Sequence, residues 1–227
     1  MKNKFGHFIT EYNKKKYVLL KILNYNNNSI DLSIINSLST KNLNYYFNKA
    51  NWSKLWSNKI DYLETLLNDN KNSKKTIYIN YDYPIGLAEI GINLYKKLEI
   101  NVPNNIAHHR IFHNMEINEI MNPFNIVIDC IERDYAEYYK NLFFKSNNFD
   151  IIEYINKCNI KILKLFFIRL LFITPFFDEA FEVILKDKDE KSIYRFIDKF
   201  EAYELEIKKI YNILRKTNQI EYIEFLS

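Results

Sequence analysis

The chain has 227 residues, of which 48% are hydrophobic and 26% charged, a balance that excludes collagen, mucin-like stalks and wholesale disorder. Glycine occurs only 3 times and proline 4 times, so the chain has too few glycines for the Gly-rich loops of nucleotide-binding enzymes. The net charge of +4 divides into +8 over residues 1–75 and −4 over residues 76–227. The basic part contains lysine but no arginine, which disfavours specific nucleic-acid recognition.

The N-terminal quarter is predicted to form helices separated by Asn-rich loops. Apolar residues at helical spacing predict a helix over 7–24, and capping residues predict two short helices over 29–38 and 40–47. A further helix of about five turns is predicted after Asn51, because apolar side chains recur there on one face. That stripe consists of Trp52, Trp56, Ile60, Leu63 and Leu67.

The segment 76–83 alternates apolar and polar side chains, which is typical of a strand, although no partner strand is evident and extended coil remains open. Pro84 suits the first turn of the next helix, which is predicted to reach Leu98. Gly86 and Gly91 each cost this helix about 1 kcal/mol relative to alanine. That cost is tolerable if another helix crosses closely there.

The second half is predicted to be helical after an irregular stretch over 99–122. A long helix is predicted to begin at Pro123 and to end at the Ser-Asn-Asn break at 146–148. The remaining predicted helices cover 151–173, 175–186, 190–216 and a short docked piece over 220–226. The predicted fold class is therefore all-α, an irregular bundle of about 7–9 antiparallel helices with at most one short extended segment near 76–83. A single domain over 1–227 is expected, with a subdivision near 146–149 as the alternative.

The run from Ile162 to Phe177 is the most hydrophobic stretch of the chain. It contains Lys164, Arg169 and Pro175, and it is shorter than the roughly 20 clean apolar residues that a membrane span requires. We therefore expect the central helix of a bundle and no membrane partner.

The N-terminus lacks the apolar stretch and cleavage site of a secretory signal, so a cytoplasmic location is predicted. Cys130 and Cys158 both fall in predicted helices, where reduced thiols behave as small apolar residues. Neither a disulfide nor a cofactor is predicted.

Three side chains in the irregular stretch form a candidate metal site. If the segment is helical, His109, His113 and Glu116 share one face and offer two imidazoles and a carboxylate. The residue after His109 is Arg110, so the general base of the metalloprotease pattern is missing. The alternative is a solvated polar turn.

An acidic region and an aromatic cluster are the candidate partner-binding features. Glu132, Asp134 and Glu137 belong to a group of six acids between residues 116 and 139 that is accompanied by one base. Such a patch suits a basic protein partner, although ordinary pairing on a helix surface explains part of it. Trp52 and Trp56 are candidate interface anchors, with core packing favoured by their helical spacing.

The chain resembles the all-α immunity proteins of bacterial polymorphic-toxin systems. The resemblance lies in a Trp-bearing helix (Trp52 and Trp56), a Pro84-led apolar helix, and an Arg133-Asp134 pair in a helix that begins at Asn122-Pro123-Phe124. It covers most of the chain at the level of architecture and transfers no residue roles. It implies a non-catalytic protein that binds and occludes a secreted toxin.

The predicted function is accordingly a protein-binding module, an antitoxin-like inhibitor with Glu132, Asp134 and Glu137 at its rim. Its expected partner is another protein, such as a basic toxin domain, and a homodimer stays open. One alternative is a metal-dependent helical enzyme built on His109, His113 and Glu116. Another is weak nucleic-acid binding through the lysine run Lys14–Lys16, which is the less favoured reading.

Overall fold

The computed structural model describes residues 8–12, 15–19, 51–69, 81–98, 105–112, 115–120, 122, 124–145, 151, 155, 160–186 and 188–227. Its helices are α2 (Trp52–Asp69), α4 (Asp82–Lys96), α5 (Ile117–Ile120), α6 (Glu132–Lys145), α8 (Ile160–Leu171), α9 (Thr174–Lys186), α10 (Lys191–Ile197), α11 (Phe200–Lys216) and the 3-10 turn η1 (Glu224–Leu226). Its strands are β1 (Phe8–Tyr12), β2 (Lys15–Leu19), β3 (Asn105–His108) and β4 (Ile126–Asp129). The described protein is mostly helical, as predicted.

Helix α2 follows the predicted pattern closely. All five residues of the predicted apolar stripe are buried, and the side chain of Asn51 caps the first turn by accepting a hydrogen bond from the amide of Lys54. Trp52 and Trp56 therefore belong to the core, with exposed fractions of 1% and 3%. Their rings pack against Tyr95 of α4 and, for Trp56, against Phe172 at the end of α8.

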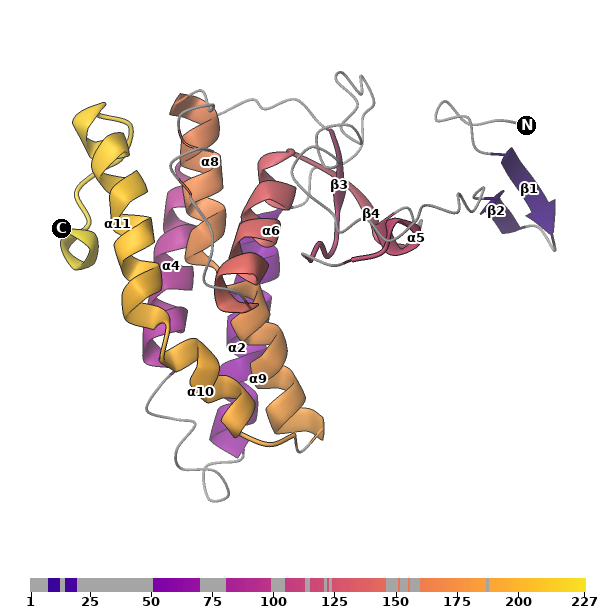
Figure 1. Ribbon diagram of the computed structural model, residues 1–227, viewed down its shortest axis with the longest axis horizontal. Coiled ribbons are helices and arrows are strands. Elements are labelled where there is room, and N and C mark those ends of the chain that lie inside the picture. The colour runs from indigo at the N-terminus through magenta and orange to yellow at the C-terminus, as the bar shows by residue number, and fades with distance from the viewer. Residues whose placement is uncertain are drawn as a thin grey trace.

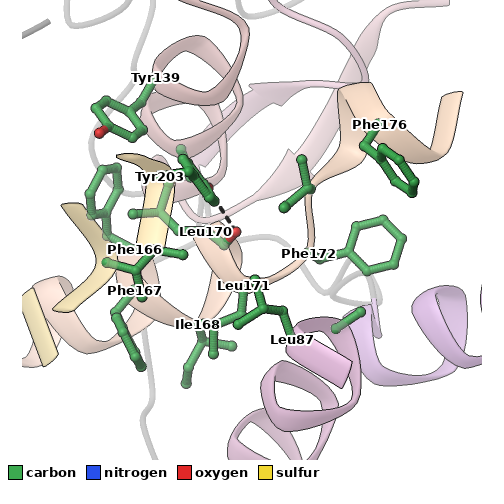
Figure 2. Close-up of a cluster of buried hydrophobic side chains, with 14 of the residues drawn as sticks. Leu87, Tyr139, Phe166, Phe167, Ile168, Leu170, Leu171, Phe172, Phe176 and Tyr203 are labelled. Atoms are coloured by element: carbon green, nitrogen blue, oxygen red, sulfur yellow. Dashed lines mark hydrogen bonds between the residues drawn. The ribbon is translucent and has the colours of Figure 1, made fainter. Parts of the chain in front are cut away.

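Helix α8 lies at the centre of the bundle, where it packs against α4, α6 and α11 (Figure 1). Its residues from Leu165 to Ile168 are almost completely buried because a neighbouring helix covers each face. Figure 2 shows the aromatic and aliphatic side chains that fill this core, among them Tyr139 of α6, whose ring centroid lies 6.4 Å from that of Tyr203 of α11. Among the described residues, no helix is both long and apolar enough to cross a membrane.

Two side chains satisfy the backbone at the C-terminal end of α8, where the last carbonyls of a helix lack partners within the helix. The ammonium of Lys140 donates to the carbonyls of Arg169 and Phe172, at 3.2 and 2.7 Å. The hydroxyl of Tyr203 donates to the carbonyl of Leu170 at 2.9 Å (Figure 2). A buried lysine on α6 is thus part of the packing of α8.

The close helix crossing expected at the glycines of α4 occurs at one of them. A Cβ added to Gly91 would lie 3.1 Å from the Cβ of Leu171 and 3.3 Å from the carbonyl oxygen of Ile168. A Cβ added to Gly86 would meet nothing within 4 Å. The absence of a side chain at Gly91 therefore lets α4 approach α8.

The C-terminal region was predicted as one helix over 190–216. The structure divides it into α10 and α11 at Asp198 and Lys199. The last residues dock as predicted, because Ile220 and Leu226 are both buried.

Two antiparallel hairpins correct the all-α prediction. In the first, β1 pairs with β2, where a helix over 7–24 was predicted. In the second, β3 pairs with β4 and sets Asn105 opposite Asp129, so the helix predicted to begin at Pro123 begins only at Glu132. A short apolar run such as Ile126–Asp129 fits a strand and a buried helix equally well by its pattern.

Three other predictions fall wholly or partly on residues outside the described set. The short helices over 29–38 and 40–47 lie outside it entirely. Of the extended segment near 76–83, residues 76–80 lie outside, while Asp82 and Tyr83 form the first turn of α4. The predicted break at 146–149 also lies outside the described residues.

Candidate functional site

The β3–β4 hairpin delivers a buried carboxylate to the start of α6. Asp129 ends β4, and its Oδ2 accepts hydrogen bonds from the indole Nε1 of Trp52 at 2.7 Å and from Nη1 of Arg133 at 3.0 Å. Its Oδ1 accepts from the amide of Cys130 at 2.8 Å. Both oxygens are therefore occupied by donors, which stabilises a carboxylate that is only 1% exposed.

A second buried carboxylate holds the end of β3. Asp134 accepts a hydrogen bond from the amide of His108 at 2.8 Å, and its other oxygen lies 2.5 Å from Nδ1 of the same histidine. Burial raises the pKa of Asp134, while the contacts with His108 and the charge of Arg133 offset part of that rise. Nε of Arg133 donates to the carbonyl of His108, so two consecutive residues of α6 fix the strand.

The third carboxylate of α6 joins three helices. Oε1 of Glu137 accepts hydrogen bonds from Lys140 at 2.9 Å, from Nε of Arg169 at 2.8 Å and from the hydroxyl of Thr174 at 3.1 Å. Burial alone would raise the pKa of Glu137, but the two cations outweigh it and lower this pKa to about 2. Burial lowers the pKa of Lys140 to about 7 against the opposing attraction of Glu137.

A cleft opens between α2, the residues after β3, and the junction of α8 with α9. The basic cleft, as we call it, has a volume of about 330 Å³ and is lined by the charged residues Lys59, Arg110, Arg133, Arg169 and Asp178 together with His109 and apolar side chains. A neighbouring cavity of about 310 Å³ shares Arg110 and Asp178 with it. The charged lining contains four cations and one carboxylate.

Asp178 is the internal counter-ion of the basic cleft. One of its oxygens lies 2.8 Å from Nζ of Lys59, and the other lies 3.4 Å from Nη2 of Arg110. The pKa of His109 is lowered first by its partial burial and then by the charges of Arg133 and Arg110. The neutral imidazole is therefore favoured at this edge of the cleft.

The predicted partner-binding residues lie in the interior. Glu132, Asp134 and Glu137 are 1–3% exposed, and the two tryptophans are equally buried. Arg133 pairs with Asp129, while Glu137 turns inward to Lys140 and Arg169. The prediction of an acidic surface patch is therefore corrected: all three carboxylates are buried, and Glu137 and Asp134 lie beside buried cations.

The structure also separates the predicted metal ligands. His109 follows a strand, and Glu116 lies exposed just before α5, so the shared helical face is absent. His113 lies outside the described residues. Within the described ranges, no three His, Cys, Asp or Glu side chains gather closely enough to hold a metal ion.

Sequence reasoning missed the basic cleft. Lys59, Arg110 and Asp178 are far apart in the chain, and each is an ordinary surface charge when considered alone. Arg169 alone indicated a buried charged site, because an arginine within the most apolar stretch of the chain needs a buried partner. That partner is Glu137.

Comparison with known proteins assigns the chain to a family. No curated protein and no solved structure matches it. A family model described as "Spore coat putative kinase YutH" matches residues 1–217, and the chain therefore belongs to this family. The predicted resemblance to immunity proteins of toxin systems, and the inhibitor function derived from it, are overturned by this match.

Proposed function

We propose that the chain is a spore-coat protein in which a kinase-like arrangement serves as a scaffold and does not transfer phosphoryl groups. Membership of the spore-coat family over residues 1–217 supports the first part. The second part depends on the surroundings of Asp129. The cytoplasmic location expected from the N-terminal sequence stays a prediction beside it.

Protein kinases carry an H-R-D motif, whose aspartate accepts the substrate proton, and later a D-F-G motif, whose aspartate holds Mg²⁺. In this chain β3 leads into His108-His109-Arg110, and β4 ends at Asp129, followed by Cys130-Ile131. If the H-R-D motif is aligned with His108-His109-Arg110, Arg110 stands in place of the aspartate that accepts the proton. The magnesium-binding aspartate is retained.

Asp129 does not fit a magnesium ligand in this setting. Mg²⁺ demands nearly ideal octahedral oxygen coordination, and it is bound through carboxylate oxygens together with waters and substrate phosphates. Both oxygens of Asp129 already accept hydrogen bonds from Trp52, Arg133 and the amide of Cys130. A metal at this carboxylate would break contacts that join β4, α2 and α6. This is the observation that carries the proposal.

The glycine content points in the same direction. A kinase covers the nucleotide phosphates with a G-x-G-x-x-G loop, and the glycines of this chain are single residues at 6, 86 and 91. Gly91 is used instead for the close contact between α4 and α8.

We also infer that residues 1–227 form a single domain with the predicted 7–9 antiparallel helices. The contacts that link α2 and α4 to α8, and α8 to α6 and α11, support one continuous core. Limited proteolysis of the purified chain would test this organisation.

Two measurements test the proposed function. A fluorescent fusion expressed in sporulating cells should form a shell at the spore periphery that persists after spore release, and a diffuse signal would contradict the coat assignment. Purified chain incubated with Mg²⁺ and radiolabelled ATP should show no phosphoryl transfer to itself or to coat extracts. Transfer that is lost in an Asp129→Asn variant that remains folded would refute the scaffold assignment.

A further inference from the structure

Two arginines that line the basic cleft keep guanidinium nitrogens free of acceptors from the part of the protein that the structure describes. Arg133 and Arg169 are 6% and 4% exposed, and both line the cleft. Among the described residues, Arg169 donates from Nε to Glu137, while Arg133 donates from Nε and Nη1 to His108 and Asp129. Nη1 and Nη2 of Arg169 and Nη2 of Arg133 thus have no acceptor there. Because both arginines line the cleft, these nitrogens can donate to an acceptor that enters it.

Two more accessible cations stand at the cleft entrance. The side chains of Arg110 and Lys59 are 61% and 37% exposed, and among the described residues Asp178 alone brings a carboxylate to the lining. Asp178 contacts both cations, so its carboxylate lies where the anionic group of a ligand would bind. An incoming anion with more oxygens could engage the outer cations and the buried guanidinium groups together.

Two aromatic side chains also line the cleft. Trp56 and Phe172 line it, with their rings stacked at 4.9 Å between centroids. The guanidinium carbon of Arg169 lies 5.1 Å from the ring centroid of Trp56, which holds the cation in place over an apolar surface. A cleft of about 330 Å³ is at the small end of the range for ligand pockets.

We propose that the basic cleft binds a small organic phosphomonoester, with its phosphate between Arg110, Lys59, Arg133 and Arg169 and its organic part against Trp56 and Phe172. Arginine forks match the geometry of phosphate oxygens, which favours a phosphate over a single carboxylate. This proposal depends on the cleft alone. It would stand if the coat assignment failed.

The intrinsic fluorescence of the protein supplies a direct binding assay. Trp52 and Trp56 are the only tryptophans of the chain, and both contact Arg169 at the cleft. Titration of the purified full chain with phenyl phosphate should give a saturable fluorescence change, and calorimetry should give the same affinity. Inorganic phosphate should bind more weakly, and sodium chloride at matched ionic strength should give no saturation.

Three variants assign the binding to this cleft. Arg110→Ala should weaken phenyl phosphate binding by roughly tenfold or more, as expected for a lost charge-assisted contact. Asp178→Asn should strengthen binding, because it removes the competing carboxylate while keeping the shape of the side chain. Arg195→Ala is the matched control, since Arg195 is another exposed arginine, at 51% against 61% for Arg110, and it lines only the neighbouring cavity.

Four results would overturn the proposal. The first is the absence of saturable binding up to about 10 mM ligand, the scale of a very weak site. The second and third are an unchanged affinity in Arg110→Ala and weaker binding in Asp178→Asn. The fourth is an effect of Arg195→Ala as large as that of Arg110→Ala. Equal affinities for inorganic phosphate and phenyl phosphate would overturn the part that concerns the organic group.

Discussion

Helices α6 and α8 pack against each other and are both buried, but they achieve burial in opposite ways. From Leu165 to Ile168, α8 presents apolar side chains in every direction. Helix α6 instead carries Glu137 and Lys140 in the interior, where they are 3% and 0% exposed. The charged side chains of α6 bind the elements around it. They form hydrogen bonds with groups at the end of α8, the end of β3 and the end of β4.

This difference affects how each helix responds to change. An apolar contact that is lost leaves a void, whereas one partner lost from a buried ion pair leaves an uncompensated charge. Side chains of α6 should therefore be less tolerant of conservative substitution than their neighbours. Substitutions in the two helices should therefore differ in their effect on the free energy of unfolding.

Glu137→Gln should reduce the free energy of unfolding by about 3–5 kcal/mol, the usual cost of breaking a buried ion pair. The amide cannot balance Lys140 and Arg169, which both lie at Glu137 in the native protein. Urea denaturation followed by circular dichroism measures the change. Glu182→Gln is the control, because its pairs with Lys186 and Lys188 are exposed to solvent and should leave the stability nearly unchanged.

The same carboxylate should give an acid-dependent contribution to stability. The pKa of Glu137 is about 2 in the folded protein against an ordinary value of 4.5, so the unfolded chain takes up the proton first. Its contribution, about 3 kcal/mol, should be complete above pH 4.5 and lost as the pH falls towards 2. The difference in unfolding free energy between the native chain and Glu137→Gln should shrink over that window. A difference that stays constant down to pH 3 would contradict this assignment.

Gly91→Ala should cost about 1–3 kcal/mol, because its Cβ would press on Leu171 and on the backbone of α8. Gly86→Ala in the same helix should instead stabilise the protein by about 0.5–1 kcal/mol, since the added methyl group meets open space. Thermal unfolding of the two variants provides the comparison. Equal shifts of the same sign would mean that α4 does not approach α8 at Gly91.

The smallest effect on stability is expected at the mouth of the basic cleft. Lys59→Ala removes an ion pair with Asp178 whose partners are partly exposed, and such pairs contribute about 0–1 kcal/mol. A larger loss of unfolding free energy would show that the cleft cations stabilise the fold as the cations of α6 do. Denaturation at low and high salt would separate the two cases.

The sequence predicts best the helices with one apolar face. The stripe of α2 follows from 3.6-residue periodicity alone, because this helix hides one face and exposes the other. The hairpin of β1 and β2 was missed because the lysine run within it also suits a helix surface. The pairing of β3 with β4 was missed because it joins residues about 20 positions apart, which no local pattern records.

The polar interior of α6 was harder still to predict. A run of charged residues is normally a solvated face, and that interpretation placed Glu132, Asp134 and Glu137 at the surface. Their burial depends on partners supplied by other elements, such as His108 from β3 and Arg169 from α8. The basic cleft follows from the same tertiary arrangement.

The role of Asp129 tests the account most directly. Asp129→Asn should lower the free energy of unfolding by about 2–3 kcal/mol and shift the tryptophan emission, because the carboxylate holds Trp52 and Arg133. Exposed Asp61→Asn on α2 should change neither property. Mg²⁺ with ATP should not stabilise the native chain through this residue. Unchanged stability in Asp129→Asn, together with a stabilisation by Mg²⁺ and ATP that the variant loses, would show that Asp129 is a metal ligand and would contradict the account.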